Sequence, residues 1–432
     1  MRVLLVTRGS QGDIYPYLAI ASELAGRGHE VTLNLPQMFE EQAKAYHLNY
    51  VLQDPDDIES MVDSAAQQSK TATPYLKWMR NVIDMQFKQL PSLLEKHDIL
   101  VATNSEFAAA SIAEYCCKPF IRTAFGPFIP GKRIPPPVFP FPKPNPVFTP
   151  GMIWKLLNVG SNYMSQKAIN RNRKLLGLKP LKNSGYYATE AAYNYLLYSR
   201  HLGSTDPDWK CRWEIGGYCF NDTLQYDEEA YRELQDFIRK DQRPVLFFTL
   251  GSCSAKNSDT FCNRLVAICG KLDYRLIVGS GWSQIGSHLG NTENIFLMKR
   301  AIPHSLIFPN CNAVMHHGGA GTTHSVARAG CPQLILPLIL DQPYWGYRVS
   351  QLKIGPEAIK IAKVSDRELE EKVRDLVTNP VYKENAMALA DKIRVEKSVD
   401  NVCDFIEKVG EKFTIKAASE NSRNLRASQS YT

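Results

Sequence analysis

The sequence predicts an α/β protein with two domains, each built around a parallel β-sheet. In the first half, apolar runs at 3–6 and 31–35 flank a stretch with helical periodicity, 14–25, which is the pattern of a βαβ unit. A second series of apolar runs, alternating with helical stretches, begins at Val245. The length of 432 residues exceeds one core of ordinary size, which favours two domains.

Composition marks the limits of these domains. The segment 219–243 is acidic and polar and is expected to link them, and an amphipathic helix followed by a polar tail is expected at the end. We therefore predict a first domain at 1–218, the linker at 219–243, a second domain at 244–397, a final helix at 398–412 and a flexible tail at 413–432.

Residues 128–150 interrupt the α/β pattern with many prolines and aromatic residues, which excludes a helix or a central strand. A helix bearing aromatic residues is expected after them, at 152–176. Three arrangements are open for this region. It can frame an apolar ligand site, reach a membrane interface with Lys132, Arg133 and Lys143 near the headgroups, or pack over the first domain.

The overall composition is that of an ordinary globular protein, with 44% hydrophobic and 22% charged residues. The net charge of +7 is too small for a nucleic-acid-binding surface but favours anionic ligands or an anionic membrane. The ten cysteines form no C-x-x-C pair, so free thiols are expected. We see no signal peptide and no long apolar span. We therefore expect a cytoplasmic protein; peripheral membrane contact and oligomeric state are left open.

The most informative stretch is 313–346, where an apolar strand runs into HHGGAGTT and then into a helix. Small residues at 318–321 let backbone N–H groups approach a ligand, and a helix beginning near Thr322 would direct its positive dipole end to the same place. They predict a diphosphate site, to which His317 and Thr322 can add hydrogen bonds. The alternative is a plain strand-to-helix turn capped by Thr322. The pair His316 and His317 lacks a third ligand, so no metal site is predicted.

Asp341 and Gln342 follow an apolar run at 333–338, which we expect to be a strand. The ends of parallel strands line the crevice in which ligands bind. A carboxylate beside an amide offers both acceptors and donors, as sugar hydroxyls require. The alternative is the polar start of a loop.

A second glycine-containing turn, GSQGD, follows the first strand. It has Gly9 and Gly12 but not the full G-x-G-x-x-G fingerprint, and an acidic side chain would repel a pyrophosphate. Asp13 is instead expected at the end of a strand, facing the ligand, where it can take a proton from a hydroxyl. The alternative is that Asp13 is the N-cap of the following helix.

Four stretches together carry a resemblance to a known family. They are GSQGDIYPYLAIASELAGRGHEV at 9–31, WEIGGYCF at 213–220, IPHSLIFPNCNAVMHHGGAGTTHSVARAGCPQLILP at 302–337 and DQPYWGYRVSQLKIGP at 341–356. The chain resembles family 1 glycosyltransferases of the GT-B fold. The branch is that of the sterol glucosyltransferases and the bacterial enzymes that glycosylate glycopeptide and macrolide antibiotics. The resemblance spans about residues 1–410.

This resemblance implies an α/β GT-B fold, in which two Rossmann-like domains face each other across a cleft and a C-terminal helix crosses back to the N-terminal domain. It implies an inverting transfer of a hexose from a nucleoside-diphosphate sugar to a lipophilic small molecule such as a sterol or a polyketide-like aglycone. UDP-glucose is favoured as donor, a dTDP-sugar is the alternative, and neither a cofactor nor a metal is expected.

The resemblance also implies roles for single residues. Asp13 is the expected general base. The expected donor-binding residues are Ser252, Arg300, Ile302, His304, His317, Gly319, Ala320, Gly321, Thr322, Asp341 and Gln342. On the acceptor side we expect Ser10, Gln11, Phe128 and Trp154. Two departures concern the acceptor: Gln11 replaces the usual Arg, and 128–150 matches no acceptor pocket that we can assign.

Other functions are weighed against this one. A nucleotide-sugar epimerase would turn over its substrate without an acceptor, and Asp13 argues against it. A non-catalytic nucleotide-sugar-binding protein would be favoured only if Asp13 or the His317 turn were degenerate, and both are intact. A dinucleotide-dependent oxidoreductase lacks its fingerprint here.

Overall fold

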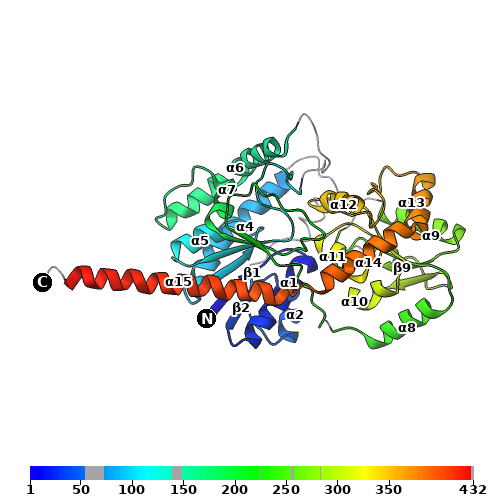
Figure 1. Cartoon of the computed structure of the whole chain (residues 1–432), viewed down its shortest axis with the longest axis horizontal. Helices are drawn as coiled ribbons and strands as arrows, with labels where there is room; N and C mark the ends of the chain where they lie inside the picture. The colour runs from blue at the N-terminus through cyan, green and yellow to red at the C-terminus, as the bar shows by residue number, and fades with distance from the viewer. Residues whose placement is uncertain (54–72, 139–147, 224, 254–256, 283, 430–432) are drawn as a thin grey trace.

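The computed structural model describes residues 1–53, 73–138, 148–223, 225–253, 257–282 and 284–429, with side chains omitted for 73–75 and 416–429. The chain forms two α/β domains placed side by side, with the C-terminal helix lying along the first (Figure 1). No helix in these ranges has the length and apolar content needed to cross a bilayer. All ten cysteines are free.

The first domain contains a parallel sheet with strand order β3-β2-β1-β4-β5-β6-β7. Within it, β1 lies between β2 and β4, and Leu5 is in register with Leu33 and Val101. These side chains are buried, because helices cover both faces of the sheet. The strands are β1 Arg2–Val6, β2 Glu30–Leu35, β3 Asn49–Leu52, β4 Ile99–Thr103, β5 Phe120–Ala124, β6 Tyr193–Leu196 and β7 Trp213–Ile215. The helices are α1 Gln11–Gly26, η1 Gln37–Phe39, α2 Glu40–Ala45, α4 Thr73–Leu94, α5 Ala109–Tyr115, α6 Pro150–Leu175 and α7 Ser184–Ala191.

The second domain contains a parallel sheet with strand order β10-β9-β8-β11-β12. Its strands are β8 Val245–Thr249, β9 Arg275–Gly279, β10 Ile295–Met298, β11 Ala313–His316 and β12 Gln333–Ile335. Its helices are α8 Glu228–Arg239, α9 Ser258–Lys271, α10 His304–Ile307, η2 Phe308–Asn310, α11 Ala320–Ala329, α12 Gln342–Gln351, α13 Asp366–Thr378 and α14 Pro380–Arg394. The predicted pair of parallel-sheet domains is confirmed.

Several predicted boundaries differ from those in the structure. The expected linker 219–243 contains α8, whose apolar face packs with Phe296 in the core of the second domain. The last strand ends at Ile335, three residues before the expected end. Helix α6 begins at Pro150, capped by Thr149, rather than at 152.

The proline-rich region 128–150 is described only in part. Residues 128–138 and 148–149 form irregular backbone, as its prolines dictate. Lys143, one of the three basic residues considered for membrane contact, lies outside the described residues.

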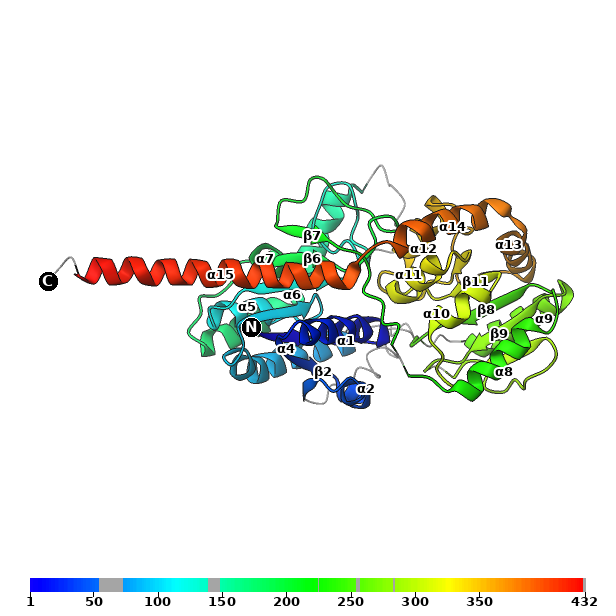
Figure 2. The ribbon, with the colours of Figure 1, turned by 60° about the horizontal axis from the view of Figure 1, so that its bottom comes forward.

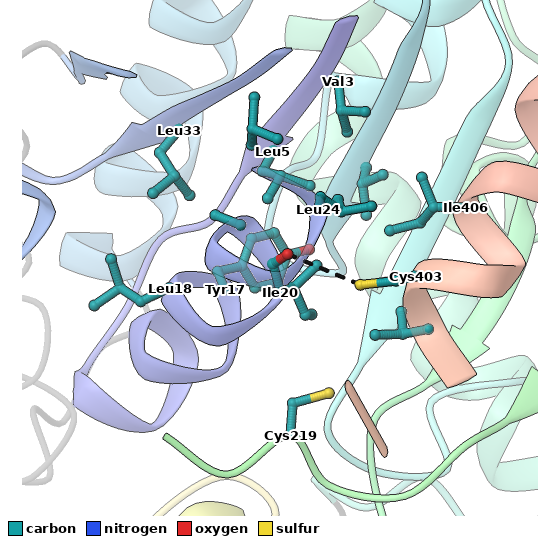
Figure 3. Packing of buried hydrophobic residues seen from close by; sticks show 14 of the residues in the cluster. Val3, Leu5, Tyr17, Leu18, Ile20, Leu24, Leu33, Cys219, Cys403 and Ile406 are labelled. Carbon is teal, nitrogen blue, oxygen red and sulfur yellow. Dashed lines mark hydrogen bonds between the residues drawn. The ribbon is translucent and has the colours of Figure 1, made fainter. Parts of the chain in front are cut away.

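The last helix, α15 Ser398–Gln429, crosses back to the first domain as expected, and it continues as helix through most of the expected tail 413–432 (Figure 2). Its apolar face, which includes Phe405 and Ile406, joins the core formed by β1, α1 and β2 (Figure 3). Cys403 lies against the backbone oxygen of Ile20, with its sulfur at 3.9 Å. This packing joins the end of the chain to the first domain.

Ion pairs surround this apolar contact. Arg27, at the end of α1, reaches Asp404 at 2.6 Å, Glu407 at 3.1 Å and Asp400 at 3.3 Å on α15. Three carboxylates from successive turns of one helix thus meet a single guanidinium group, which fixes the register of α15 against α1.

A third apolar cluster is shared by the two domains. It joins Tyr198 and Leu202 of the first domain to Trp345 and Ile393 of the second. Polar contacts accompany it: the backbone N–H of Ser204 donates to the Tyr344 hydroxyl at 2.8 Å. The two domains therefore meet through a packed apolar surface.

Replacing Ile406 by Ala should lower the free energy of unfolding by about 2–4 kcal/mol, because a fully buried side chain is removed from a packed core. Urea denaturation followed by circular dichroism would measure the loss. Ile415→Ala is the matched control, since Ile415 lies on the same helix and is 69% exposed. Equal stability of the Ile406 and Ile415 variants would show that α15 does not contribute to the core.

Candidate active site at the domain junction

The first half of the site is the turn between β1 and α1. Gly9 has φ of +135°, and a Cβ placed there would overlap the carboxylate of Asp13, so this close approach requires glycine. The backbone N–H of Ser10 donates to Asp13 Oδ2 at 2.8 Å, and the Ser10 hydroxyl lies 3.3 Å from the same oxygen. Asp13 Oδ1 takes part in neither contact and is the oxygen left to accept a proton.

The alternative prediction, that Asp13 is the N-cap of the helix, is wrong about which residue is the cap. Ser10 is the N-cap of α1, and Asp13 is the third residue of the helix. Asp13 is therefore the acidic member of a capping box and not the N-cap itself. This contact stabilises the helix start and also holds the carboxylate in one orientation.

The pKa of Asp13 is raised to about 7, mainly because desolvation disfavours the charged carboxylate. The hydrogen bonds from Ser10 oppose this effect, and the nearby charge of Asp341 from the second domain adds to it. A carboxyl group that titrates near neutral pH is suited to general-base catalysis under physiological conditions.

The second half of the site is the turn between β11 and α11, which places His317 between two glycines. A Cβ on Gly251 would lie 2.6 Å from the ring Cε1, and a Cβ on Gly319 would lie 2.5 Å from Nε2. Burial lowers the pKa of His317 to about 4, so the ring is neutral at pH 7. Its Nδ1 is buried and has no hydrogen-bond partner within the described ranges. Such an atom is expected where a ligand supplies the partner.

His316 has a different role from its neighbour. Its Nδ1 accepts from the backbone N–H of Gly318 at 3.1 Å, so the hydrogen on Nε2 points to Gln333 Oε1 at 2.9 Å. Both ring nitrogens are used inside the protein. Among the described residues, no group of three or more His, Cys, Asp or Glu is arranged to hold a metal ion.

Helix α11 begins at Ala320, two residues before the expected start, with Gly319 as its N-cap. The first bond of the helical ladder runs from Thr323 N to Gly319 O at 3.0 Å, so the N–H groups of residues 320–322 precede the ladder. Thr322 lies in the first turn and is not the cap. The free N–H groups and the helix dipole make this end favourable for an anion.

The two turns meet at the domain junction. A Cβ on Gly321 would lie 2.6 Å from the hydroxyl of Tyr218 and 3.6 Å from the Cα of Gly12. The Tyr218 hydroxyl donates to the backbone oxygen of Gly12 at 3.3 Å. The N-termini of α1 and α11 are therefore in contact, which brings Asp13 and the turn of His317 to the same place.

Asp341 precedes α12 and is half-buried at this junction. The indole N–H of Trp345, one turn later, donates to Asp341 Oδ2 at 2.8 Å. Burial raises the pKa of Asp341 to about 6, and the bond from Trp345 opposes this shift. The carboxylate is thus held by one oxygen, and Oδ1 takes no part in that bond.

Gln342 has a structural role that the sequence did not predict. It is buried, and its Oε1 accepts from the backbone N–H groups of Leu338 and Ile339 at 2.7 and 3.0 Å. Its Nε2 points to Cys253 Sγ at 3.4 Å. The structure gives Gln342 the role of bracing the loop after β12.

Two other expected donor residues, Ser252 and His304, lie near His317. Ser252 is half-buried in the turn that follows β8, directly after Gly251. His304 is close enough to lower the pKa of His317, and burial lowers its own pKa to about 4. A third expected donor residue, Ile302, is buried in an apolar cluster of the second domain.

Arg300 is exposed, although it lies only two residues before the buried Ile302 along the chain. Its guanidinium pairs with Asp227 at 2.5 Å. Asp227 in turn caps α8 through the backbone N–H of Ala230. The positive charge of Arg300 is therefore used at the start of α8 in this structure.

The expected acceptor-side residues divide into two groups. Gln11 is exposed at the start of α1, and Phe128 is half-buried, with its ring and that of Trp345 both next to Gly126. Trp154, by contrast, is buried, and its indole N–H donates to a backbone oxygen of the loop after β5 at 2.8 Å. Trp154 therefore holds this loop in place.

Sequence reasoning missed Trp345, Tyr218 and His324, which support the site. The rings of Tyr218 and His324 are stacked with centroids 4.9 Å apart, and His324 Nε2 accepts from the backbone N–H of Ser199 at 3.1 Å. The spacing of Trp345 four residues after Asp341 is the one signal that was available, because such residues share a helix face.

Two family descriptions match parts of the chain. Residues 3–134 match the glycosyltransferase family 28 N-terminal domain. Residues 263–409 match the C-terminal domain of proteins like erythromycin biosynthesis protein CIII. The first match contains Asp13, and the second contains His317 and Asp341.

Curated relatives are similar over most of the chain. Sterol 3-beta-glucosyltransferase UGT80A2 of Arabidopsis thaliana is 26% identical over 92% of the chain, but the chain spans only 64% of that protein's length. O-mycaminosyltylonolide 6-deoxyallosyltransferase of Streptomyces fradiae is 27% identical over 95% of the chain, which here spans 98% of the relative.

Solved structures share the fold. The glycosyltransferase of kitacinnamycin aligns with a TM-score of 0.69 at 18% identity, covering 94% of this chain and 98% of that one. The glycosyltransferase VinC, solved in complex with dTDP, aligns with a TM-score of 0.68 at 16% identity, covering 95% and 100%. The GT-B fold expected from the sequence is confirmed.

Replacing Gly321 by Ala should destabilise the domain junction by about 1–3 kcal/mol, because the new Cβ would overlap the Tyr218 hydroxyl. Adding Tyr218→Phe should restore most of the loss, since the hydroxyl is the nearest obstacle. Chemical denaturation of both single variants and the double variant would measure the coupling. Gly270→Ala is the control, because nothing lies within 4 Å of its Cβ position. Additive effects of the two changes would contradict the contact.

Proposed function

Because the chain is a GT-B-fold homologue of the sterol and antibiotic glycosyltransferases, we propose that it is an inverting glycosyltransferase. It transfers a hexose from a nucleoside-diphosphate sugar, UDP-glucose in preference to a dTDP-sugar, to a hydroxyl of a lipophilic small molecule. The observation that carries the proposal is the contact of Gly12 with Gly321, which sets a poised carboxyl group opposite an anion-binding helix end.

The donor site in this proposal lies on the second domain. The diphosphate is bound by the backbone N–H groups of residues 320–322 and by the side chain of His317. The imidazole of His317 is neutral, and its buried Nδ1 has no partner among the described residues, so the ring can donate one hydrogen bond to the ligand. Asp341 accepts from hydroxyls of the sugar through Oδ1, while Gln342 holds the loop that carries Asp341. Ser252 lies beside the phosphates.

The proposed reaction is a single displacement. Asp13 takes the proton of the acceptor hydroxyl as the oxygen bonds to the anomeric carbon. The bond from that carbon to the phosphate oxygen breaks on the opposite face, and the nucleoside diphosphate leaves with the electron pair, so the configuration inverts. The N-terminus of α11 and His317 stabilise the negative charge that develops on the leaving group, without a metal ion.

A lipophilic acceptor is supported by the side chains beside Asp13 and Asp341. The rings of Phe128 and Trp345 both lie close to Gly126. The indole of Trp345 also donates to the Asp341 carboxylate. An apolar alcohol would be desolvated here, which also keeps water from the anomeric carbon.

His317→Ala should weaken binding of a nucleoside diphosphate by about tenfold or more, because a hydrogen bond to a charged oxygen is lost. Calorimetric titration with UDP, dTDP, their glucose conjugates and NAD would measure this and identify the base. His288→Ala, on an exposed histidine of the same domain, is the matched control. Absence of binding to any nucleotide sugar by the unmodified protein would overturn the proposal. Turnover of a nucleotide sugar without acceptor would indicate an epimerase.

The pKa of Asp13 predicts that kcat/KM rises with pH and levels off above about 7, because only the deprotonated carboxylate can accept the proton. Asp341→Asn removes a like charge and should move this rise to lower pH, whereas Asp236→Asn, on the exposed face of α8, should not.

Asp13→Asn keeps an acceptor for Ser10 and should lower kcat by roughly 10²–10⁴ with donor affinity retained. A parallel loss of donor affinity and thermal stability would assign Asp13 a capping role alone.

A further inference from the structure

Helix α6 carries an apolar face that no other part of the described chain covers. Met152, Leu156, Val159 and Tyr163 follow one another at spacings of four, three and four residues, so they lie along one side of the helix. Their exposed fractions are 52%, 68%, 65% and 80%. We call these four residues the α6 stripe. A continuous exposed stripe of this kind marks a binding surface.

The opposite side of α6 fixes the helix to the first domain, so the stripe cannot turn inward. Trp154 is buried and bonded to the loop after β5, and Ala168 and Ile169 lie in the core with α4 and α5. Arg173 pairs with Glu114 at 2.7 Å. In Figure 1, α6 lies on the outer surface of the first domain, away from α15.

The charges on α6 are all of one sign. The helix has no acidic residue, and Lys155, Lys167 and Lys174 are exposed. None of the ion pairs formed by the described residues uses these three lysines. Lys167 and Lys174 continue the direction of the stripe toward the C-terminal end of the helix. Exposed lysines therefore lie beside the α6 stripe, at Lys155, and beyond its C-terminal end, at Lys167 and Lys174.

We propose that this face of α6 docks on a lipid bilayer with anionic headgroups, with the α6 stripe in the apolar boundary and Lys155, Lys167 and Lys174 at the phosphates. An interfacial helix combines these two features. A second copy of the chain fits less well. Antiparallel pairing of two α6 helices would set the lysines of each against the apolar stripe of the other.

The position of α6 connects this surface to the proposed active site. Its first turn lies against the loop after β5, where a Cβ on Gly151 would be 3.9 Å from the backbone oxygen of Gly131. The same loop carries Phe128 to the ring of Trp345. If the proposed function holds, an acceptor dissolved in the bilayer would reach the site along this loop, but the docking itself does not depend on catalysis.

Vesicle sedimentation of the full chain tests the proposal, with phosphatidylcholine alone and with phosphatidylglycerol added. We expect binding to the anionic vesicles that weakens in salt, and a loss of about tenfold or more in Leu156→Ser/Val159→Ser. Val381→Ser/Met387→Ser is the matched control, because both residues are exposed apolar residues of α14. Lys167→Gln/Lys174→Gln should weaken binding to anionic vesicles, and Lys360→Gln/Lys363→Gln should not.

Circular dichroism and calorimetric nucleotide titration of the same proteins separate this proposal from the function. Vesicle binding by a protein that binds no nucleotide would support the docking and reject the proposed function. Nucleotide binding without vesicle binding, or equal vesicle binding by the Leu156→Ser/Val159→Ser variant, would overturn the docking. A dimer in analytical ultracentrifugation that this variant abolishes would instead identify the face as an interface between copies.

Discussion

The close contact between the N-termini of α1 and α11 is the constraint on which the site depends. Glycine at 321 lets the start of α11 approach Gly12, because the Tyr218 hydroxyl, which donates to the Gly12 backbone oxygen, fills the space that a side chain at 321 would need. Without that approach, the carboxylate of Asp13 and the N-terminus of α11 would lie apart, because they belong to different domains. Small side chains and one hydroxyl group thus set the geometry in which transfer becomes feasible.

The surrounding structure keeps these helix ends in register. The apolar cluster shared by the domains and the return of α15 onto α1 both restrict how the domains can rotate. Arg27 adds three carboxylate contacts on α15. Because a packed apolar surface is costly to open, the junction is held by burial, and the polar groups within it serve mainly orientation.

Two carboxyl groups with raised pKa values lie at one junction. Asp13 and Asp341 come from different domains, and each is desolvated, so both have a raised pKa. Their hydrogen bonds limit the effect in different ways, through the Ser10 turn for Asp13 and through the indole of Trp345 for Asp341. The same bonds leave one oxygen of each carboxyl group free of these partners. The two carboxyl groups are chemically similar but have different hydrogen-bond partners.

The sequence alone determined the two parallel-sheet domains and the returning helix, and it predicted Asp13, His317 and Asp341 as site residues, because periodicity and local turn chemistry depend on neighbours along the chain. Only the tertiary structure decided that Gln342 braces a loop, that Trp154 is buried and that Arg300 pairs with Asp227. It also revealed Trp345, which bonds to Asp341, and Tyr218, which bonds to Gly12, both at the junction between the domains. Hydrogen bonds between the domains depend on the distance between residues in space, and this distance cannot be predicted from their separation along the sequence.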